Sequence, residues 1–216
     1  MTGWVESRQQ TDRDLVRHYW PVELRPAFDA LFGVDDALAE VVTSSTQPAL
    51  GAIRLAWWRE ALERLDTSPP PPEPRLQAVA AELLPLGVTG AMLAELEDGW
   101  AALLDEEQEI ERVAVRGEKL FEMAARLLGA SDMKLELAGR VYGYGSAFRT
   151  GLIGPHWPTG ELRQLHRHRF PRRLRPLTGL ARLAARDARP PPNREPEATP
   201  GRAAALLSHR LSGRVV

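Results

Sequence analysis

Two acidic side chains, Asp36 and Glu40, have a spacing that suits metal and diphosphate binding. They lie four residues apart in a stretch with helical apolar periodicity, so a helix would place both carboxylates on one face. Mg²⁺ prefers oxygen ligands, and two such pairs facing each other across a helical bundle could hold Mg²⁺ and a diphosphate. Glu118 and Glu122 have the same spacing, but their helix carries acids all round. A solvated helix face is the simpler interpretation of both pairs.

Other residue types that bind metals or act as nucleophiles are sparse. The chain has no cysteine, and His166 and His168 are two residues apart, so they would not share a helix face. It contains no GxSxG, Walker A or GxGxxG motif. The sequence therefore predicts no cofactor, and Mg²⁺ would enter only with Asp36 and Glu40.

A stretch with two adjacent tryptophans, PALGAIRLAWWREAL at positions 48–62, is the most distinctive helical segment. Trp57 and Trp58 would point about 100° apart on a helix, which predicts that this helix is wedged between several others. Arg54 and Arg59 lie beside the indoles. Two interpretations stay open: their stems cover the indole faces of a core helix, or their guanidinium groups line an anion-accepting cavity.

Three glycines, Gly139, Gly143 and Gly145, fall within one expected helix. Each costs roughly 1 kcal/mol relative to alanine inside a helix. Such a cost indicates either close packing against another helix or a ligand near the backbone.

The net charge of −1 conceals an asymmetry along the chain. Residues 1–155 carry 15 Lys and Arg against 25 Asp and Glu, whereas residues 156–216 carry 13 Arg against 4 acids. The basic run Arg163–Arg175 could bind lipid headgroups, nucleic acid or a prenyl diphosphate, or it could neutralise the acidic helix at 105–122. It includes Phe170 but little other aromatic character, so we expect no nucleic-acid partner.

The composition predicts an all-α protein of about nine to eleven helices, since Ala, Leu, Arg and Glu are abundant and β-branched residues are scattered. We expect a helical domain over residues 1–188, a Pro-rich linker at 189–200, and a C-terminal helix within 201–216 that packs on the same domain. A second Pro-rich spacer is expected at 66–74. The sequence shows no secretory signal and no apolar run of about 20 residues, which favours a cytoplasmic location. Helices are expected at 12–19, 23–42, 48–62, 75–84, 89–104, 106–128, 132–152, 161–169, 172–186 and 201–211.

Several segments together resemble the squalene/phytoene synthase family. They are DRDLVRHYWPVELRPAFDAL (12–31), QPALGAIRLAWWREAL (47–62), LEDGWAALLD (96–105) and GRVYGYGSAFRTGL (139–152). The resemblance covers nearly the whole chain, and the WWREAL block is its most specific part. The likeness is greatest to a divergent, phytoene-synthase-like branch that includes a mitochondrial assembly factor for respiratory complex I. It implies an isoprenoid-synthase-like fold, a single helical domain around a central cavity.

The resemblance also implies which metal-binding motifs an active enzyme would need. Synthases of this family join two prenyl diphosphates head to head, using two DxxxD motifs that hold Mg²⁺. In register with the WW block, the first motif falls near Ala39 and Thr43, and the second would lie in the helix at 139–154, which has no carboxylate. Loss of the Mg²⁺ cluster would remove the main assistance to ionisation. The resemblance thus implies a non-catalytic protein; the alternative is an active head-to-head prenyl diphosphate transferase that uses Asp36 and Glu40.

For a non-catalytic member, the expected partners are a prenyl diphosphate or another lipid, or a protein. Residues expected to contact the ligand are Arg25, Arg54, Arg59, Tyr142 and Arg149; Arg25 and Arg54 match positions associated with the family. Peripheral contact with the inner membrane face is expected through Arg163–Arg175.

Overall fold

The computed structural model describes residues 10–155, 157–189 and 194–216, and every regular element within these ranges is helical. The expected all-α class with nine to eleven helices is thereby confirmed. Residues 190–193, which belong to the expected linker, lie outside the described residues, and so does His156. The α-helices are α1 (Asp12–Arg17), α2 (Arg25–Ser44), α3 (Pro48–Arg64), α4 (Pro74–Glu82), α5 (Gly90–Ala94), α6 (Leu96–Ala101), α7 (Ile110–Leu127), α8 (Leu135–Thr150), α9 (Thr159–Leu165), α10 (Arg175–Asp187) and α11 (Pro200–Ser212), with short 3-10 helices at Val22–Leu24, Leu84–Leu86 and Arg172–Leu174.

Local sequence accounts for most helix starts. The hydroxyl of Thr11 accepts a hydrogen bond from the amide of Asp14, and the Asp14 carboxylate accepts one from the Thr11 amide, which completes a capping box at α1. At the starts of α5 and α11, the hydroxyls of Thr89 and Thr199 accept hydrogen bonds from the backbone amides of Met92 and Arg202. Pro48 lies in the first turn of α3, where its missing N–H costs nothing.

The expected helix at 89–104 is two helices, α5 and α6, interrupted at Glu95. Leu93, Leu96 and Trp100 are all buried, so the apolar pattern runs unbroken through the interruption and could not reveal it. The expected helix at 106–128 begins only at Ile110.

Helices α7 and α8 form the tightest pair in the molecule, and glycines make this possible. A Cβ built on Gly143 would lie 2.6 Å from the carbonyl oxygen of Val113, and one on Gly139 would lie 2.6 Å from that of Gly117. A Cβ on Gly145 would lie 2.5 Å from the Cβ of Ala184 in α10. Close helix packing therefore explains the three glycines of α8.

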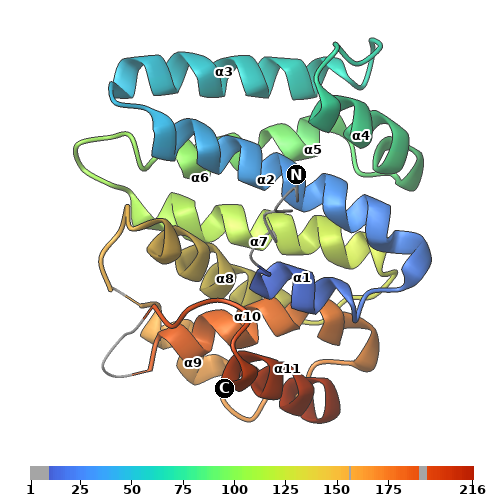
Figure 1. Ribbon diagram of the computed structural model, residues 1–216, viewed down its shortest axis with the longest axis vertical. Coiled ribbons are helices and arrows are strands. Elements are labelled where there is room, and N and C mark those ends of the chain that lie inside the picture. The colour runs from blue at the N-terminus through green and yellow to red at the C-terminus, as the bar shows by residue number, and fades with distance from the viewer. Residues whose placement is uncertain (1–9, 156, 190–193) are drawn as a thin grey trace, which may run out of the picture.

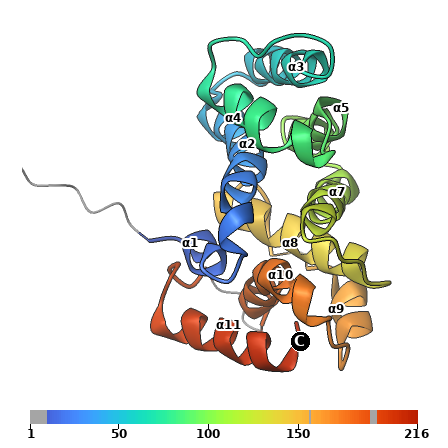
Figure 2. The ribbon, with the colours of Figure 1, turned by 90° about the vertical axis from the view of Figure 1, so that its right-hand side faces the viewer.

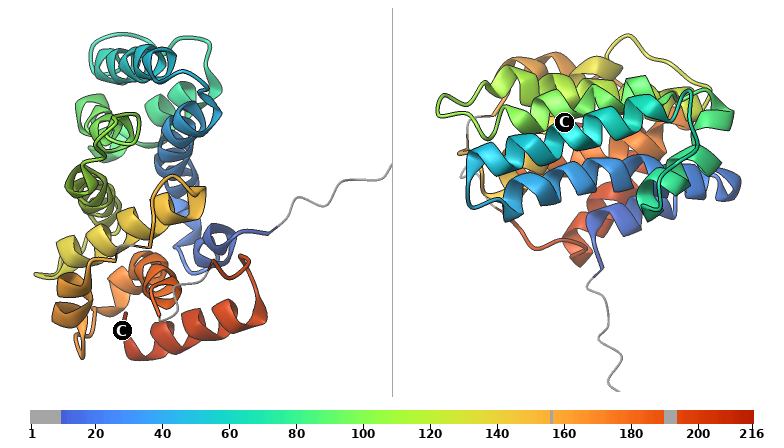
Figure 3. Two further views of the ribbon diagram at one scale, coloured as in Figure 1. Left: turned by 90° about the vertical axis from the view of Figure 1, so that its left-hand side faces the viewer. Right: turned by 90° about the horizontal axis from the view of Figure 1, so that it is seen from above.

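The helices are stacked from α3 at one end to α11 at the other (Figures 1 and 2). Seen from above, α3 lies over α2 as the outermost helix (Figure 3). Helix α3 packs against α2, α5 and α6, as the two divergent indoles predicted, but these helices bury only Trp58, and Trp57 is 48% exposed. At the opposite end, α11 packs against α10 and α1.

Candidate functional site

A partly open cavity of about 740 Å³ lies among α1, α2, α8 and α10. This volume is within the range of roughly 300–1,000 Å³ that small-molecule sites occupy. One part of the lining is apolar and the other carries many charges. The apolar lining includes Phe28, Phe32, Ala39, Trp100, Leu180, Leu183 and Ala184.

Aromatic rings form a continuous apolar wall of the cavity. The ring centroids of Phe28 and Phe32 are 4.5 Å apart, and Tyr142 meets Phe32 edge-on at 6.1 Å. Tyr142 is buried, and this burial raises the pKa of its hydroxyl, so the group stays protonated and can donate a hydrogen bond. Gly33 also lines the cavity, and a Cβ built on it would meet nothing within 4 Å. The wall therefore has free space in front of α2.

Arg13 of α1 holds Asp36 at the cavity edge. Its Nη1 and Nη2 each donate to one carboxylate oxygen of Asp36 at 2.6 Å, and Nη1 also donates to the carbonyl of Phe32 at 3.1 Å. Burial lowers the pKa of Arg13, but the nearby Tyr142 and Asp36 raise it by more, so the guanidinium is firmly charged. Both oxygens that a cation would need from Asp36 are thus bound by arginine.

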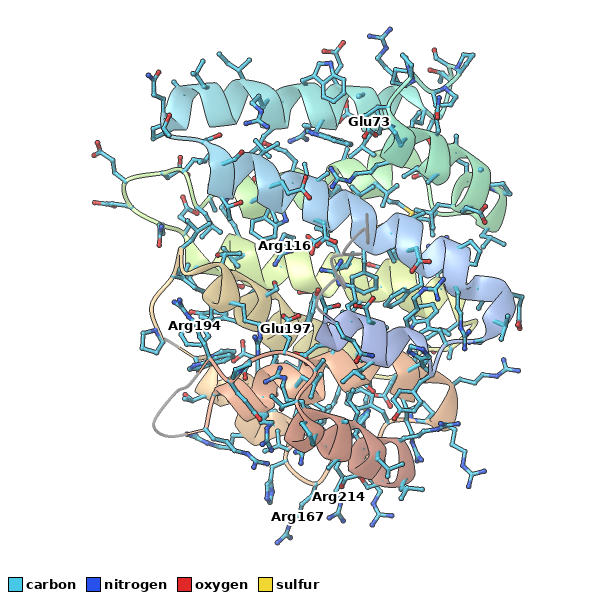
Figure 4. The ribbon with its side chains drawn as sticks, in the orientation of Figure 1. Glu73, Arg116, Arg167, Arg194, Glu197 and Arg214 are labelled. Atoms are coloured by element: carbon cyan, nitrogen blue, oxygen red, sulfur yellow. The ribbon has the colours of Figure 1, made fainter. Side chains whose placement is uncertain are left out.

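Asp35, the neighbour of Asp36, points into the protein and forms a buried ion pair with Arg116 of α7. The side chains of both residues are almost fully buried. Trp100 donates its indole N–H to Asp35 at 2.8 Å, and Arg116 donates to the hydroxyl of Ser146 at 2.6 Å. The guanidinium carbon of Arg116 lies 4.1 Å from the centroid of the Trp100 ring. This network joins α2, α6, α7 and α8 behind the cavity, and Figure 4 shows Arg116 in the middle of the molecule.

A second network closes the other side of the cavity. Arg202 of α11 is buried and donates to Asp12 at 2.8 Å and to Asp187 at 2.5 Å. Arg149 donates from Nε to Asp187 at 2.9 Å, and its Nη1 lies 3.6 Å from Glu197 in the segment before α11. Each arginine here is matched by carboxylates, so the cavity offers no unpaired cation from this network.

Every arginine that lines the cavity has a carboxylate partner, and more acids than arginines line it. Among the lining residues, Arg17 pairs with Asp29, and Arg75 pairs with Glu40 on α2. No group of three or more His, Cys, Asp or Glu in the described ranges is arranged to hold a metal ion. The acidic lining residues are Asp12, Asp14, Asp29, Asp35, Asp36, Asp187 and Glu197, and the basic ones are Arg13, Arg17, Arg75, Arg149 and Arg202.

The structure brings together only some of the residues that the sequence singled out. Tyr142, Arg149 and Asp36 line the cavity, whereas Glu40 lies on α2 outside its lining. Arg25 donates to the carbonyl of His18.

The two arginines of α3 also lie away from the cavity. Arg54 is exposed and donates to the hydroxyl of Ser44, and Arg59 pairs with Glu63 and Glu97. These side chains therefore do not form the expected anion-accepting cavity. The reason is that α3 lies on the outside of the molecule, one helix layer removed from the cavity.

Sequence reasoning missed four side chains that organise the site: Arg13, Asp35, Arg116 and Arg202. The only local signal in the sequence is that an ionisable residue falls on the apolar side of an expected helix. Arg116 follows Val113 in the buried stripe of α7, and Asp35 follows Leu31 in that of α2. An ionisable residue at such a position predicts a buried partner, but it does not say which one.

Comparison with protein-family models, with curated proteins and with solved structures finds no match for this chain. In the described ranges, no helix combines the length and the apolar character needed to cross a lipid bilayer.

Proposed function

We propose that this protein is a non-catalytic relative of the squalene/phytoene synthases that binds an isoprenoid or similar lipid in the cavity among α1, α2, α8 and α10. The resemblance of the sequence supports the isoprenoid ligand class. The aromatic and leucine wall supports an apolar chain, and the volume of about 740 Å³ is ample for one. A role as an assembly-type protein that binds a protein partner is compatible with the same lack of catalysis.

One observation carries the proposal that the protein is not catalytic: the ion pair between Arg13 and Asp36. Both oxygens of Asp36 accept hydrogen bonds from Arg13, and Arg75 donates to Glu40 at 2.7 Å. A Mg²⁺ ion would have to displace both arginines to use this pair. The cavity-facing part of α8 supplies Tyr142, Gly145, Ser146 and Arg149, none of which is a carboxylate. Metal-assisted ionisation of a diphosphate is therefore disfavoured here.

The lining also favours a ligand whose polar end is neutral. Acids outnumber arginines, and each lining arginine already has a carboxylate partner. A diphosphate bound without metal would have to compete with these carboxylates for the arginines, whereas a prenyl alcohol could hydrogen-bond to Tyr142, Ser146 or Thr150 at little electrostatic cost.

The experiment is a thermal-shift series with farnesol, geranylgeraniol and their diphosphates, each with and without Mg²⁺. A ligand that binds only the folded protein raises the melting temperature by mass action. We expect a shift with the alcohols that is the same in both buffers. A shift that requires both a diphosphate and Mg²⁺ would overturn the non-catalytic assignment and support an active transferase. No shift with any of the four compounds would overturn prenyl binding.

A matched pair of variants at Gly33 tests the location. A Cβ at Gly33, which lines the cavity, meets nothing within 4 Å, so Gly33→Leu would extend an apolar side chain from this open position, whereas Gly33→Ala adds only one methyl group. We expect Gly33→Leu to abolish the ligand-induced shift and Gly33→Ala to retain it. Equal shifts in both variants would place the ligand elsewhere.

A further inference from the structure

The end of the molecule that carries α11 combines exposed leucines with arginines that have no acidic partner. Leu207 and Leu211 are 53% and 75% exposed, and they lie one helical turn apart on the outer face of α11. The inner face of the same helix buries Ala205, Leu206 and His209. Helix α11 is therefore apolar on two faces, only one of which the fold covers.

The same end of the molecule carries arginines without carboxylates to neutralise them. Residues 162–186 and 198–216 contain no Asp or Glu. In the described part of the chain, no ion pair joins the exposed arginines of this end to a carboxylate, in contrast to the paired arginines that line the cavity. The unpaired, exposed arginines are Arg163, Arg167, Arg169, Arg172, Arg173, Arg210 and Arg214.

The segment after α9 and the end of α11 are held together as one surface. The amide of Phe170 donates to the carbonyl of Gly213 at 2.9 Å. Arg175, which is half-buried, donates to the carbonyls of Phe170, Arg210 and Leu211 at 2.9–3.1 Å, so one cation joins the segment to the last turn of α11. Figure 4 shows both Arg167 and Arg214 at this end of the molecule, each pointing away from the body. The segment that carries the arginines and the last turn of α11 are thus fixed relative to each other.

We infer that this basic face, made of residues 163–173 and the outer side of α11, docks onto an anionic lipid surface. Arginines complement lipid phosphates in charge, and each basic residue near an anionic leaflet contributes on the order of 1 kcal/mol. Leu207 and Leu211 would enter the boundary between headgroups and acyl chains, as in interfacial amphipathic helices. A nucleic acid would match the charge, but it would leave both leucines exposed to water, and no exposed Phe, Tyr or Trp lies on this face to stack on bases.

Vesicle co-sedimentation tests this inference independently of the cavity. The full chain is mixed with vesicles of phosphatidylcholine alone, or of phosphatidylcholine with phosphatidylglycerol, at low salt and at about 0.5 M salt. We expect binding to the anionic vesicles alone, weakened at least several-fold by salt. Equal binding to both vesicle types, or none to either, would overturn the inference. So would salt-sensitive binding to DNA without binding to vesicles.

Paired variants locate the surface. The double variant Arg167→Gln with Arg214→Gln should weaken vesicle binding about tenfold or more. The double variant Leu207→Ser with Leu211→Ser should weaken vesicle binding several-fold, and the remaining binding should still depend on salt.

Matched controls lie at exposed positions of α3, at the opposite end of the molecule. They are Arg54→Gln with Arg64→Gln, and Leu50→Ser with Ile53→Ser. The controls should bind as the unaltered protein does. An equal loss in the controls would show that this face is not the docking surface. Melting temperatures verify that each variant is folded.

Discussion

The Arg13 guanidinium and the Asp36 carboxylate form a two-pronged ion pair at the edge of the cavity, with both N–O distances at 2.6 Å. The sequence presents Asp36 as half of a metal-binding pair with Glu40, and the structure gives each of these acids an arginine partner instead. The carboxylate oxygens that a metal ion would need are therefore already bound by arginines.

We predict that Asp36→Asn lowers the free energy of unfolding by no more than about 1 kcal/mol, because the pair is partly exposed and screened by solvent. The same change should leave prenyl-alcohol binding intact and should not alter the response to Mg²⁺. Denaturant unfolding and thermal shifts measure both effects. A Mg²⁺-dependent stabilisation that the unaltered protein shows and Asp36→Asn lacks would contradict the assignment.

The buried pair of Asp35 and Arg116 should behave differently. Asp35→Asn leaves the Arg116 charge buried without its counter-charge, so we expect the free energy of unfolding to fall by about 3–5 kcal/mol. The double variant Asp35→Leu with Arg116→Met removes both charges, and its loss of unfolding free energy should be clearly smaller than the sum of the losses in its two component single variants, Asp35→Leu and Arg116→Met. Denaturant titration of the three variants measures this coupling, and simple additivity would refute it.

Gly143 should tolerate no side chain. A Cβ at this position would lie 2.6 Å from the Val113 carbonyl oxygen and 3.1 Å from the Gly117 backbone, so Gly143→Ala must push α7 and α8 apart. We expect a loss of about 1–3 kcal/mol in unfolding free energy.

Gly33→Ala is the matched control, because it is also a change in a helix interior but has open space around the new methyl group. It should be neutral or should stabilise the protein by up to about 1 kcal/mol. Equal effects of the two substitutions on the unfolding midpoint would contradict the packing explanation.

His209 makes the stability depend on pH. Its Nδ1 donates to the carbonyl of Arg214 at 2.8 Å, and its Nε2 lies 3.0 Å from the hydroxyl of Thr178. Burial lowers the pKa of His209 from 6.5 to about 4, aided by the nearby Arg182 and Arg175. Below pH 6.5 the unfolded chain therefore binds a proton that the folded protein does not accept until about pH 4, so stability falls as the pH drops through this window.

The corresponding measurement compares unfolding free energies at pH 7 and pH 5. From pH 7 to pH 5, the free energy of unfolding of the unaltered protein should fall by about 2 kcal/mol more than that of His209→Gln, which has no titrating ring. Identical pH dependence in both proteins would show that His209 titrates normally in the folded state.

The sequence by itself determined the helical class and many helix ends, because these depend on local properties such as the capping box of Thr11 and Asp14. For the glycines of α8 it left two alternatives, close packing or a nearby ligand, and the structure decided for close packing. The interruption at Glu95 was not predictable, because burial on both sides keeps the apolar pattern continuous.

Only the tertiary structure decided which charges meet and where the cavity lies. Arg13 and Asp36 are 23 residues apart, and Asp12 and Arg202 are 190 residues apart, so no local spacing could pair them. Sequence periodicity also could not tell that α3 has a single covered face, which leaves Trp57 exposed and Arg54 remote from the cavity. The physical reason is that an ion pair or a cavity wall depends on how whole helices pack, and that packing is set by contacts summed over the entire chain.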